Sequence, residues 1–365
     1  MSVLEKLSIV IPTYDRHDFV RRQISYWSDS DVTVHIMDGS QVPISQENLE
    51  DLAPNIKYHH SNDDFFTRMH KATDLVDTPY VAMLGDDDLF LTGGLNECIR
   101  RLETESSLIG VVGRAVYFFF QRDKVLGNQI HSLSSNYPNG IDGGIARLNN
   151  LYHDGKIGAV AYGVYRSESW CSAIQTTYGK RYSCAYVYDT FLRTMLTYLG
   201  EIKVSESLVW LCSGENPPIK NESSFNRKVD LIDWFDGVEY VEEVADYKVR
   251  LTEALFAEGK DSREAIERSV SYVVSTLESR YQVKAQQRTS IAKRIPVLVQ
   301  RYVPKTIKDF GKDYLPLKLK KILDWQNFTL LEVLEQMKTR GIVYDNAEVG
   351  RVIALIKDFH NKITV

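Results

Sequence analysis

The chain has 365 residues, is 44% hydrophobic and carries a formal net charge of −5 at pH 7, so it can bury the core of one large or two ordinary domains. It contains no apolar run near the roughly 20 residues that span a bilayer, and we expect neither a transmembrane helix nor a secretory signal. Its cysteines form no Cys-x-x-Cys pair, which argues against zinc and fits a reduced, cytoplasmic compartment: they are Cys98, Cys171, Cys184 and Cys212.

Short apolar runs and helical patterns alternate through the first 90 residues. Apolar runs predict strands at 7–11, 32–37, 56–60 and 78–84. Apolar residues at helical spacing predict a helix after the first strand and another before the fourth, at 18–27 and 64–77. This order predicts an α/β fold with a mostly parallel sheet flanked by helices.

Three acids follow the fourth predicted strand without a break: Asp86, Asp87 and Asp88. Adjacent carboxylates at a buried strand end repel one another and resist ionising together. A divalent cation such as Mg²⁺ or Mn²⁺ removes this conflict, because it binds carboxylate oxygens together with substrate phosphates. The alternative is a solvated acidic turn, which needs no ion.

The pattern is less regular beyond the acids. A helix is predicted at 95–102, and a strand is predicted at 109–120. The polar stretch 121–142 is predicted to be a loop over the site, where loops often carry function.

Two prolines at 217–218, within a polar stretch, predict a boundary between a domain at 1–220 and a mainly helical domain at 221–365. The second domain has helical patterns at 229–258 and 262–282, and 330–359 is predicted to cover the following tract or a second protomer. That tract, 284–325, alternates basic and apolar residues. It would suit an anionic membrane surface or, alternatively, pack on the first domain with its lysines solvated. No motif for reading nucleic acid is present.

The motif at residues 9–16, Ile-Val-Ile-Pro-Thr-Tyr-Asp-Arg, resembles the opening strand of family 2 glycosyltransferases. Asp38-Gly39-Ser40 resembles the end of that family's second strand, and the acid triplet resembles its DxD motif. The likeness covers roughly the first 215 residues and implies a GT-A fold. Residues 157–166 resemble the family's strand that faces the acceptor sugar, and 201–204 and 207–211 resemble its closing strands. It also implies a metal-dependent, inverting enzyme of bacterial surface-polysaccharide synthesis. Such an enzyme moves a sugar from a nucleotide-sugar donor, with UDP favoured, to a hydroxyl of a glycan or lipid-linked acceptor.

The resemblance assigns roles at the donor site. Asp86 and Asp88 would hold Mn²⁺ or Mg²⁺, directly or through water. The family often has Asp-Ser-Asp-Asp where this chain has Gly-Asp-Asp-Asp, so which two of the three acids touch the ion stays open. A basic side chain such as Arg68 near the diphosphate also makes physical sense, because phosphate oxygens accept charge-assisted hydrogen bonds. The alternative is that Arg68, like most helix arginines, is simply solvated. The residues implied in nucleotide-sugar binding are Pro12, Thr13, Tyr14, Arg16, Asp38, Gly39, Arg68, Lys71, Asp86 and Asp87.

The resemblance also implies a base, Asp189, at the start of a helix, where it would take the proton of the attacking acceptor hydroxyl. Tyr188 stands where the family usually has a glutamate and would contact the acceptor, as would Gly163. The alternatives are a helix N-cap for Asp189 and a plain core strand around Gly163.

A second class of function stays open, namely a non-catalytic module that binds nucleotide sugar or glycan, or serves as a scaffold. The enzyme is favoured because Asp38, the acid triplet and Asp189 occur together. An enzyme that uses lipid-linked acceptors would be cytoplasmic and peripheral on the inner face of the cell membrane, and a homo-oligomer is compatible with the sequence.

Overall fold

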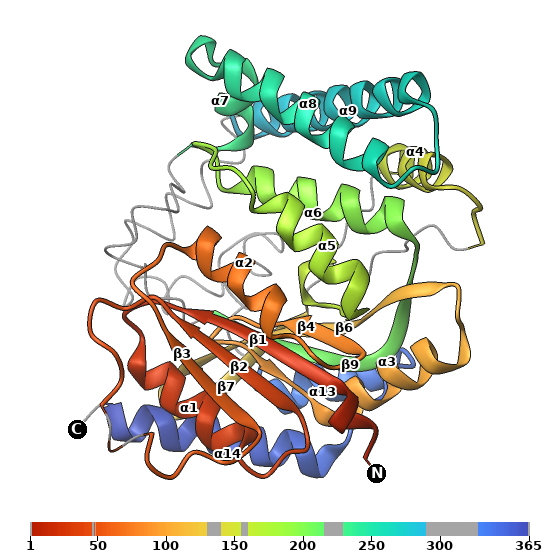
Figure 1. The fold of residues 1–365 in the computed structure, drawn as a ribbon. Coiled ribbons are helices and arrows are strands. Elements are labelled where there is room, and N and C mark those ends of the chain that lie inside the picture. Colours follow the sequence, from red (N-terminus) through yellow and green to blue (C-terminus); the bar gives the residue numbers. More distant parts are fainter. Residues whose placement is uncertain are drawn as a thin grey trace.

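The computed structural model describes residues 2–363 except 46, 48, 130–139, 155–159, 215–228 and 290–327. Within these residues nine strands form one sheet in the order β3-β2-β1-β4-β8-β6-β9-β5, with β7 paired to β6 (Figure 1). The strands are β1 Leu7–Thr13, β2 Thr33–Asp38, β3 Ile56–His60, β4 Tyr80–Met83, β5 Leu89–Phe90, β6 Leu108–Gln121, β7 Lys124–Gln129, β8 Val164–Arg166 and β9 Glu201–Ser213.

Helices cover both faces of the sheet (Figure 1). The helices of the first part are α1 His17–Trp27, α2 Phe65–Leu75, α3 Thr92–Thr104, α4 Gly144–Asp154, α5 Ser167–Thr177 and α6 Tyr186–Leu199. Those of the last part are α7 Leu231–Asp236, α8 Val241–Ala257, α9 Arg263–Thr289, α13 Leu330–Lys338 and α14 Asn346–Ile363.

The four strands β3, β2, β1 and β4 are parallel, which confirms the predicted α/β class. In β1, Leu7, Ile9, Val10 and Ile11 are all 0% exposed. A strand buried on both faces needs a continuous apolar run rather than an alternating one, and this is why the N-terminal strands were visible in the sequence. Beyond β4 the sheet is mixed, because β8 pairs antiparallel with β4 and β6, whereas β6 and β9 are parallel.

The middle of the chain differs from the prediction in three places. Part of the predicted loop 121–142 is β7, which forms a hairpin with β6 through a turn at Arg122 and Asp123, with φ of 52° and 60°. The predicted strand 157–166 is shorter: a 3₁₀ turn at Val160–Tyr162 precedes β8, and 157–159 lie outside the described residues. The two strands expected at 201–204 and 207–211 are one continuous 13-residue strand, β9.

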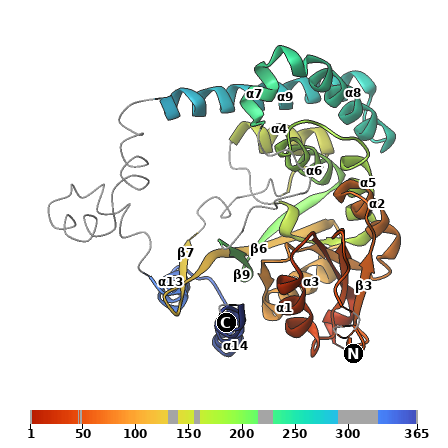
Figure 2. The ribbon, with the colours of Figure 1, turned by 90° about the vertical axis from the view of Figure 1, so that its left-hand side faces the viewer.

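The C-terminal half does not pack along the predicted division between 1–220 and 221–365. Helices α7–α9 share one apolar core with α4–α6, and they lie on the far side of α5 and α6 from the sheet (Figures 1 and 2). Helices α13 and α14 return to the sheet and share a core with β6 and β9. Most of the basic tract 284–325 lies outside the described residues. No helix in the described part is both long and apolar enough to cross a membrane.

Helix α3 is capped by a residue from α14. Its own N-cap residue, Leu91, supplies no side-chain hydrogen bond. Instead Glu348, only 5% exposed, accepts from the backbone N–H of Thr92 at 2.5 Å, from that of Gly93 at 3.2 Å and from the Thr92 hydroxyl at 2.7 Å. A carboxylate here satisfies unpaired N–H groups and favours the positive end of the helix dipole.

Replacing Glu348 with Ala is therefore expected to lower the free energy of unfolding by about 1–2 kcal/mol, as loss of a helix cap does. Urea denaturation followed by circular dichroism measures this. The matched control is Glu97→Ala on α3 itself, which removes a partly exposed i,i+4 pair with Arg101 and should cost less than about 0.5 kcal/mol. Equal losses for the two variants would contradict the capping role.

Candidate active site

A cavity of about 350 Å³ opens where β1 and β4 end. Segments that are distant in the sequence meet at this cavity. They are the ends of the two strands, the N-terminus of α2, the turn before β8 and the start of α6. This is the carboxyl edge of the parallel strands, where open α/β sheets bind ligands. Its wall is formed by Pro12, Thr13, Tyr14, Arg16, Phe65, Arg68, Met83, Leu84, Gly85, Asp86, Asp87, Ala161, Tyr162, Tyr178, Ala185, Tyr186, Tyr188 and Asp189.

The backbone of residues 86–88, the acid turn, is held by side chains of α1. Gln23 donates its side-chain amide to the carbonyls of Asp86, at 2.9 Å, and Asp88, at 2.7 Å. Arg22 donates to the carbonyl of Asp87 at 2.6 Å, and its guanidinium lies over the ring of Phe359 in α14, 4.6 Å from the centroid. The turn is thus fixed by side chains of the first and last helices of the chain.

The three carboxylates are between 4% and 6% exposed. The Thr13 hydroxyl donates to Asp86 at 2.7 Å, and the Arg16 guanidinium lies 3.0 Å from Asp86 and 3.2 Å from Asp87. Burial raises the pKa of Asp86 to about 6, although Arg16 opposes the shift. Burial, together with the neighbouring Asp87, also raises the pKa of Asp88 well above its ordinary value. The predicted conflict between adjacent acids is present, and the solvated acidic turn is not.

Asp88 points away from the cavity. Its Oδ1 accepts the backbone N–H of Ser213, at the end of β9, at 2.7 Å, and Asp88 does not form part of the wall. Of the three acids of this turn, Asp86 and Asp87 lie on the wall, whereas the metal pair implied by the resemblance is Asp86 and Asp88.

The carboxylates of the cavity suit a metal ion whose remaining ligands come from the substrate. Among the described residues, no group of three or more histidines, cysteines and acids is arranged to hold a metal. Mg²⁺ is commonly bound by only one or two carboxylates plus substrate phosphates. Asp87 Oδ2 is buried without a hydrogen-bond partner in the described part of the chain, so it has capacity for a further ligand.

Asp38 and Gly39 support the site instead of lining it. Asp38 is 0% exposed and accepts from the Ser40 backbone N–H at 2.8 Å and the Tyr58 hydroxyl at 2.5 Å. A Cβ on Gly39 would collide with the Arg68 guanidinium. Neither residue forms part of the cavity wall, and their contact with the nucleotide stays a prediction.

Arg68 is neither solvated nor directed mainly at a ligand. It is 1% exposed and donates to the carbonyls of Thr13 at 2.7 Å, Met37 at 2.6 Å and Asp63 at 3.1 Å. These bonds join the ends of β1 and β2 to the start of α2, while the side chain still borders the cavity. Lys71 is exposed, pairs with Asp63 and does not reach the cavity, in contrast to its predicted role.

Replacing Arg68 with Met keeps the volume but leaves buried carbonyls unpaired, which is expected to lower the free energy of unfolding by about 2–4 kcal/mol. Chemical denaturation measures the loss. Lys71→Met, an exposed change on the same helix, should alter stability by no more than about 0.5 kcal/mol. If Arg68→Met were as stable as the unaltered protein, the role of Arg68 in joining the ends of β1 and β2 to α2 would be refuted.

Asp189 lies in the first turn of α6 and on the cavity wall. The N-cap of this helix is Ala185, so the alternative N-cap role is excluded for Asp189. The ring of Tyr188 borders the cavity, while its hydroxyl accepts the Tyr182 backbone N–H at 2.6 Å. Gly163 is not on the wall, because it packs against the ring of Tyr165, and its neighbours Ala161 and Tyr162 line the cavity instead.

The segment before α6 is anchored to α8. Glu243 accepts from the Ser183 backbone N–H at 2.9 Å and from its hydroxyl at 2.6 Å. Asp246 accepts from the Tyr182 hydroxyl at 2.9 Å. The outer helical layer thereby fixes the approach to Asp189.

The family model for glycosyl transferase family 2 matches residues 8–169. This segment contains β1, β4 and the acid turn, which contribute residues to the cavity wall. Residues 8–169 belong to glycosyl transferase family 2. A comparison of the chain with curated proteins finds no match.

Two solved structures share the fold of the chain. S. aureus TarS 1-349 matches with 12% identity and a TM-score of 0.51, over 93% of each chain. S. aureus TarS 1-349 in complex with UDP-GlcNAc matches with 13% identity and a TM-score of 0.50, again over 93% of each chain. Likeness at this identity concerns the fold alone, and with the family match it confirms the GT-A fold.

Four aromatic residues of the cavity were missed by sequence reasoning. They lie in four separate segments, and no motif marks them. Their only signal was proximity in sequence to predicted site residues, since Phe65 precedes Arg68 and Tyr186 precedes Asp189. The four residues are Phe65, Tyr162, Tyr178 and Tyr186.

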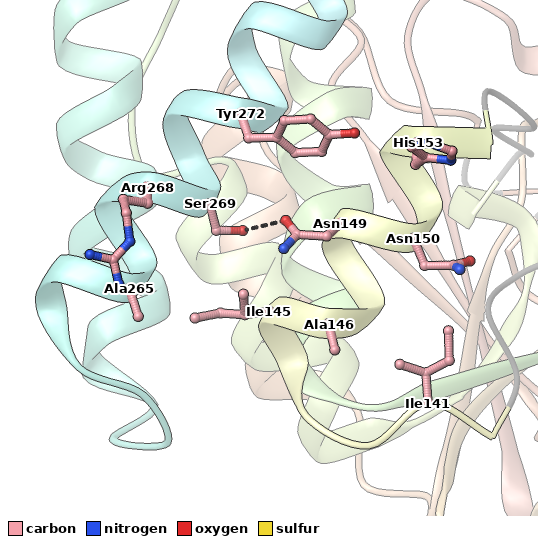
Figure 3. Close-up of a pocket in the computed structure, with 10 residues that line it drawn as sticks. All are labelled: Ile141, Ile145, Ala146, Asn149, Asn150, His153, Ala265, Arg268, Ser269 and Tyr272. Carbon is pink, nitrogen blue, oxygen red and sulfur yellow. Dashed lines mark hydrogen bonds between the residues drawn. The ribbon is translucent and has the colours of Figure 1, made fainter.

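A second, wider cavity of about 580 Å³ lies between α4 and α9 (Figure 3). Asn149 and His153 come from α4, whereas Arg268, Ser269 and Tyr272 come from α9, and the Ser269 hydroxyl donates to Asn149 at 3.4 Å. None of the residues that line it is an acid. It therefore offers no carboxylate that could act as a base or hold a divalent ion for glycosyl transfer.

Proposed function

We propose that the protein is a metal-dependent, inverting glycosyltransferase that moves a sugar from a nucleotide-sugar donor to a hydroxyl of a glycan or lipid-linked acceptor. One observation carries the proposal. Asp86 and Asp87 share a cavity with Asp189, although about a hundred residues separate them in the sequence. Metal-assisted loss of a diphosphate and removal of a hydroxyl proton need carboxylates at both places.

The chain's own residues divide the work. Asp86 and Asp87 would hold Mn²⁺ or Mg²⁺, which when bound neutralises charge on the departing diphosphate. Arg16, beside both acids, can donate charge-assisted hydrogen bonds to phosphate oxygens. Asp189 accepts the proton of the acceptor hydroxyl as that oxygen attacks the anomeric carbon. A single base on the acceptor side favours inversion.

The substrate class follows from the cavity and the likeness in fold. The aromatic wall suits the apolar faces of a base and of sugar rings, and its acids suit a diphosphate with a cation. A UDP-sugar is the first donor to test, since one TarS structure of this fold contains UDP-GlcNAc. The acceptor would belong to a surface polysaccharide or glycoconjugate. A lipid-linked acceptor would put the enzyme at the cytoplasmic face of the cell membrane.

The direct test is a screen of nucleotide sugars for hydrolysis, with Mn²⁺, with Mg²⁺ and with EDTA. Release of nucleotide from one donor with metal, and none with EDTA, is expected. NMR of the sugar at early times gives the anomeric configuration, and inversion is expected. Absence of binding for every nucleotide sugar would overturn the proposal.

A further inference from the structure

Arg16 occupies the space between the two acids of the cavity wall. Its guanidinium lies 3.0 Å from Asp86 and 3.2 Å from Asp87, and its side chain is only 9% exposed. It also lies over the ring of Phe19, 4.4 Å from the centroid. Nε and Nη2 of Arg16 are buried without a hydrogen-bond partner among the described residues, so the guanidinium is held by charge more than by directed bonds.

The oxygens that Arg16 approaches are the ones a divalent ion would need. Asp86 already accepts the Thr13 hydroxyl at Oδ2, and Oδ1 faces Arg16. Asp87 Oδ2 faces the other end of the same guanidinium. A metal ion placed on these oxygens would lie within a few ångströms of a buried positive charge, and two cations at that distance repel strongly in a dry site.

A diphosphate would change this balance. Arginine presents paired N–H donors that match phosphate oxygens, and Arg16 lies on the cavity wall where such a group would enter. Contact with phosphate would draw the guanidinium off the carboxylates and leave their oxygens for a metal. It would also give hydrogen-bond partners to Nε and Nη2 of Arg16, which have none among the described residues.

We propose that Arg16 is an internal counter-ion that blocks the acids against a free divalent metal and yields them when a nucleoside diphosphate group binds. The inference rests on the proposed function, because it assumes that this cavity takes a diphosphate with a metal. It adds an order of events and a reason for it. The metal binds weakly alone, and the nucleotide and the metal strengthen each other's binding through one side chain.

The test is calorimetric titration of Mn²⁺ into the metal-free protein without nucleotide. Arg16→Gln is expected to bind Mn²⁺ about tenfold more tightly than the unaltered protein, or better, since a buried positive charge beside the ion is removed. The matched control is Arg21→Gln on the same helix. Arg21 pairs with Asp18 at the surface, and its loss should leave Mn²⁺ affinity unchanged.

Two further variants keep the outcome decisive. Arg16→Gln combined with Asp86→Asn must lose the gained affinity, because otherwise the Mn²⁺ binds elsewhere and the inference is wrong. Arg16→Lys keeps a charge but lacks the planar fork that spans both acids, so an intermediate Mn²⁺ affinity is expected. Arg16→Lys also serves as the test if Arg16→Gln does not fold.

Titration of UDP separates this inference from the proposed function. In the unaltered protein Mn²⁺ should tighten UDP binding strongly, and in Arg16→Gln the factor by which it does so should shrink about tenfold or more, as the Mn²⁺ titration predicts. If Mn²⁺ tightens UDP binding by the same factor in Arg16→Gln as in the unaltered protein, or if Arg16→Gln gains no Mn²⁺ affinity, only the role of Arg16 is overturned. A failure of the unaltered protein to bind any nucleotide overturns the proposed function as well.

Discussion

Replacing Asp189 with Asn is expected to reduce sugar transfer by about 10²–10⁴-fold, the range over which a positioned general base contributes. Asparagine has nearly the same shape but cannot take up the proton of the attacking hydroxyl. Because Asp189 belongs to α6 and is not one of the proposed metal ligands, the affinity for UDP with Mn²⁺ should change less than about threefold. Initial rates of transfer and calorimetry of UDP measure the two effects separately.

The control is Asp233→Asn, which alters an exposed acid in the first turn of α7. It should leave both rate and affinity unchanged. If Asp189→Asn transferred sugar at the unaltered rate, another residue would be the base. If the unaltered protein bound nucleotide sugar but neither transferred nor hydrolysed it, the non-catalytic module would be the better description.

Replacing Asp86 with Asn is expected to weaken Mn²⁺-dependent binding of UDP by about 10–100-fold, since one unit charge at contact distance from the cation is lost. The difference between UDP titrations in Mn²⁺ and in EDTA measures it. The sequence pattern alone predicts a comparable loss for Asp88→Ala. The geometry assigns the larger effect to Asp86, which faces the cavity, and a smaller one to Asp88, which accepts from Ser213.

Asp88→Asn is the comparison variant for this prediction. It removes a charge next to the same turn, but from a side chain off the cavity wall. Its main effect should be on stability, through the Ser213 bond. A greater loss of metal-dependent binding for Asp88→Asn than for Asp86→Asn would show that the acids rearrange when nucleotide binds.

The sequence predicted the N-terminal half well because its signals are local. Residues 56–60 form a strand with the predicted bounds, and the apolar runs around β1 and β4 are buried as expected. The motifs located the strand ends correctly. They did not give the direction of each side chain, so Asp38 and Asp88 were assigned to ligands although both satisfy neighbouring protein groups.

The parts that failed depend on contacts between distant residues. The β6–β7 hairpin turns at Arg122 and Asp123, without the Asn-Gly or Asp-Gly pair that makes such turns visible. The return of α13 and α14 to the sheet depends on the apolar core that they share with β6 and β9. No local pattern encodes a cap on Thr92 from Glu348, which lies 256 residues further on.

The capping of α3 by Glu348 and the stacking of Phe359 on Arg22 have a consequence for synthesis of the protein on the ribosome. While the nascent chain ends before residue 348, α3 lacks its cap from Glu348 and Arg22 lacks its contact with Phe359, however completely the first strands have paired. The final arrangement around the acid turn therefore forms only after this segment has been synthesised. A growing polypeptide that already contains every acid of the cavity still lacks these contacts.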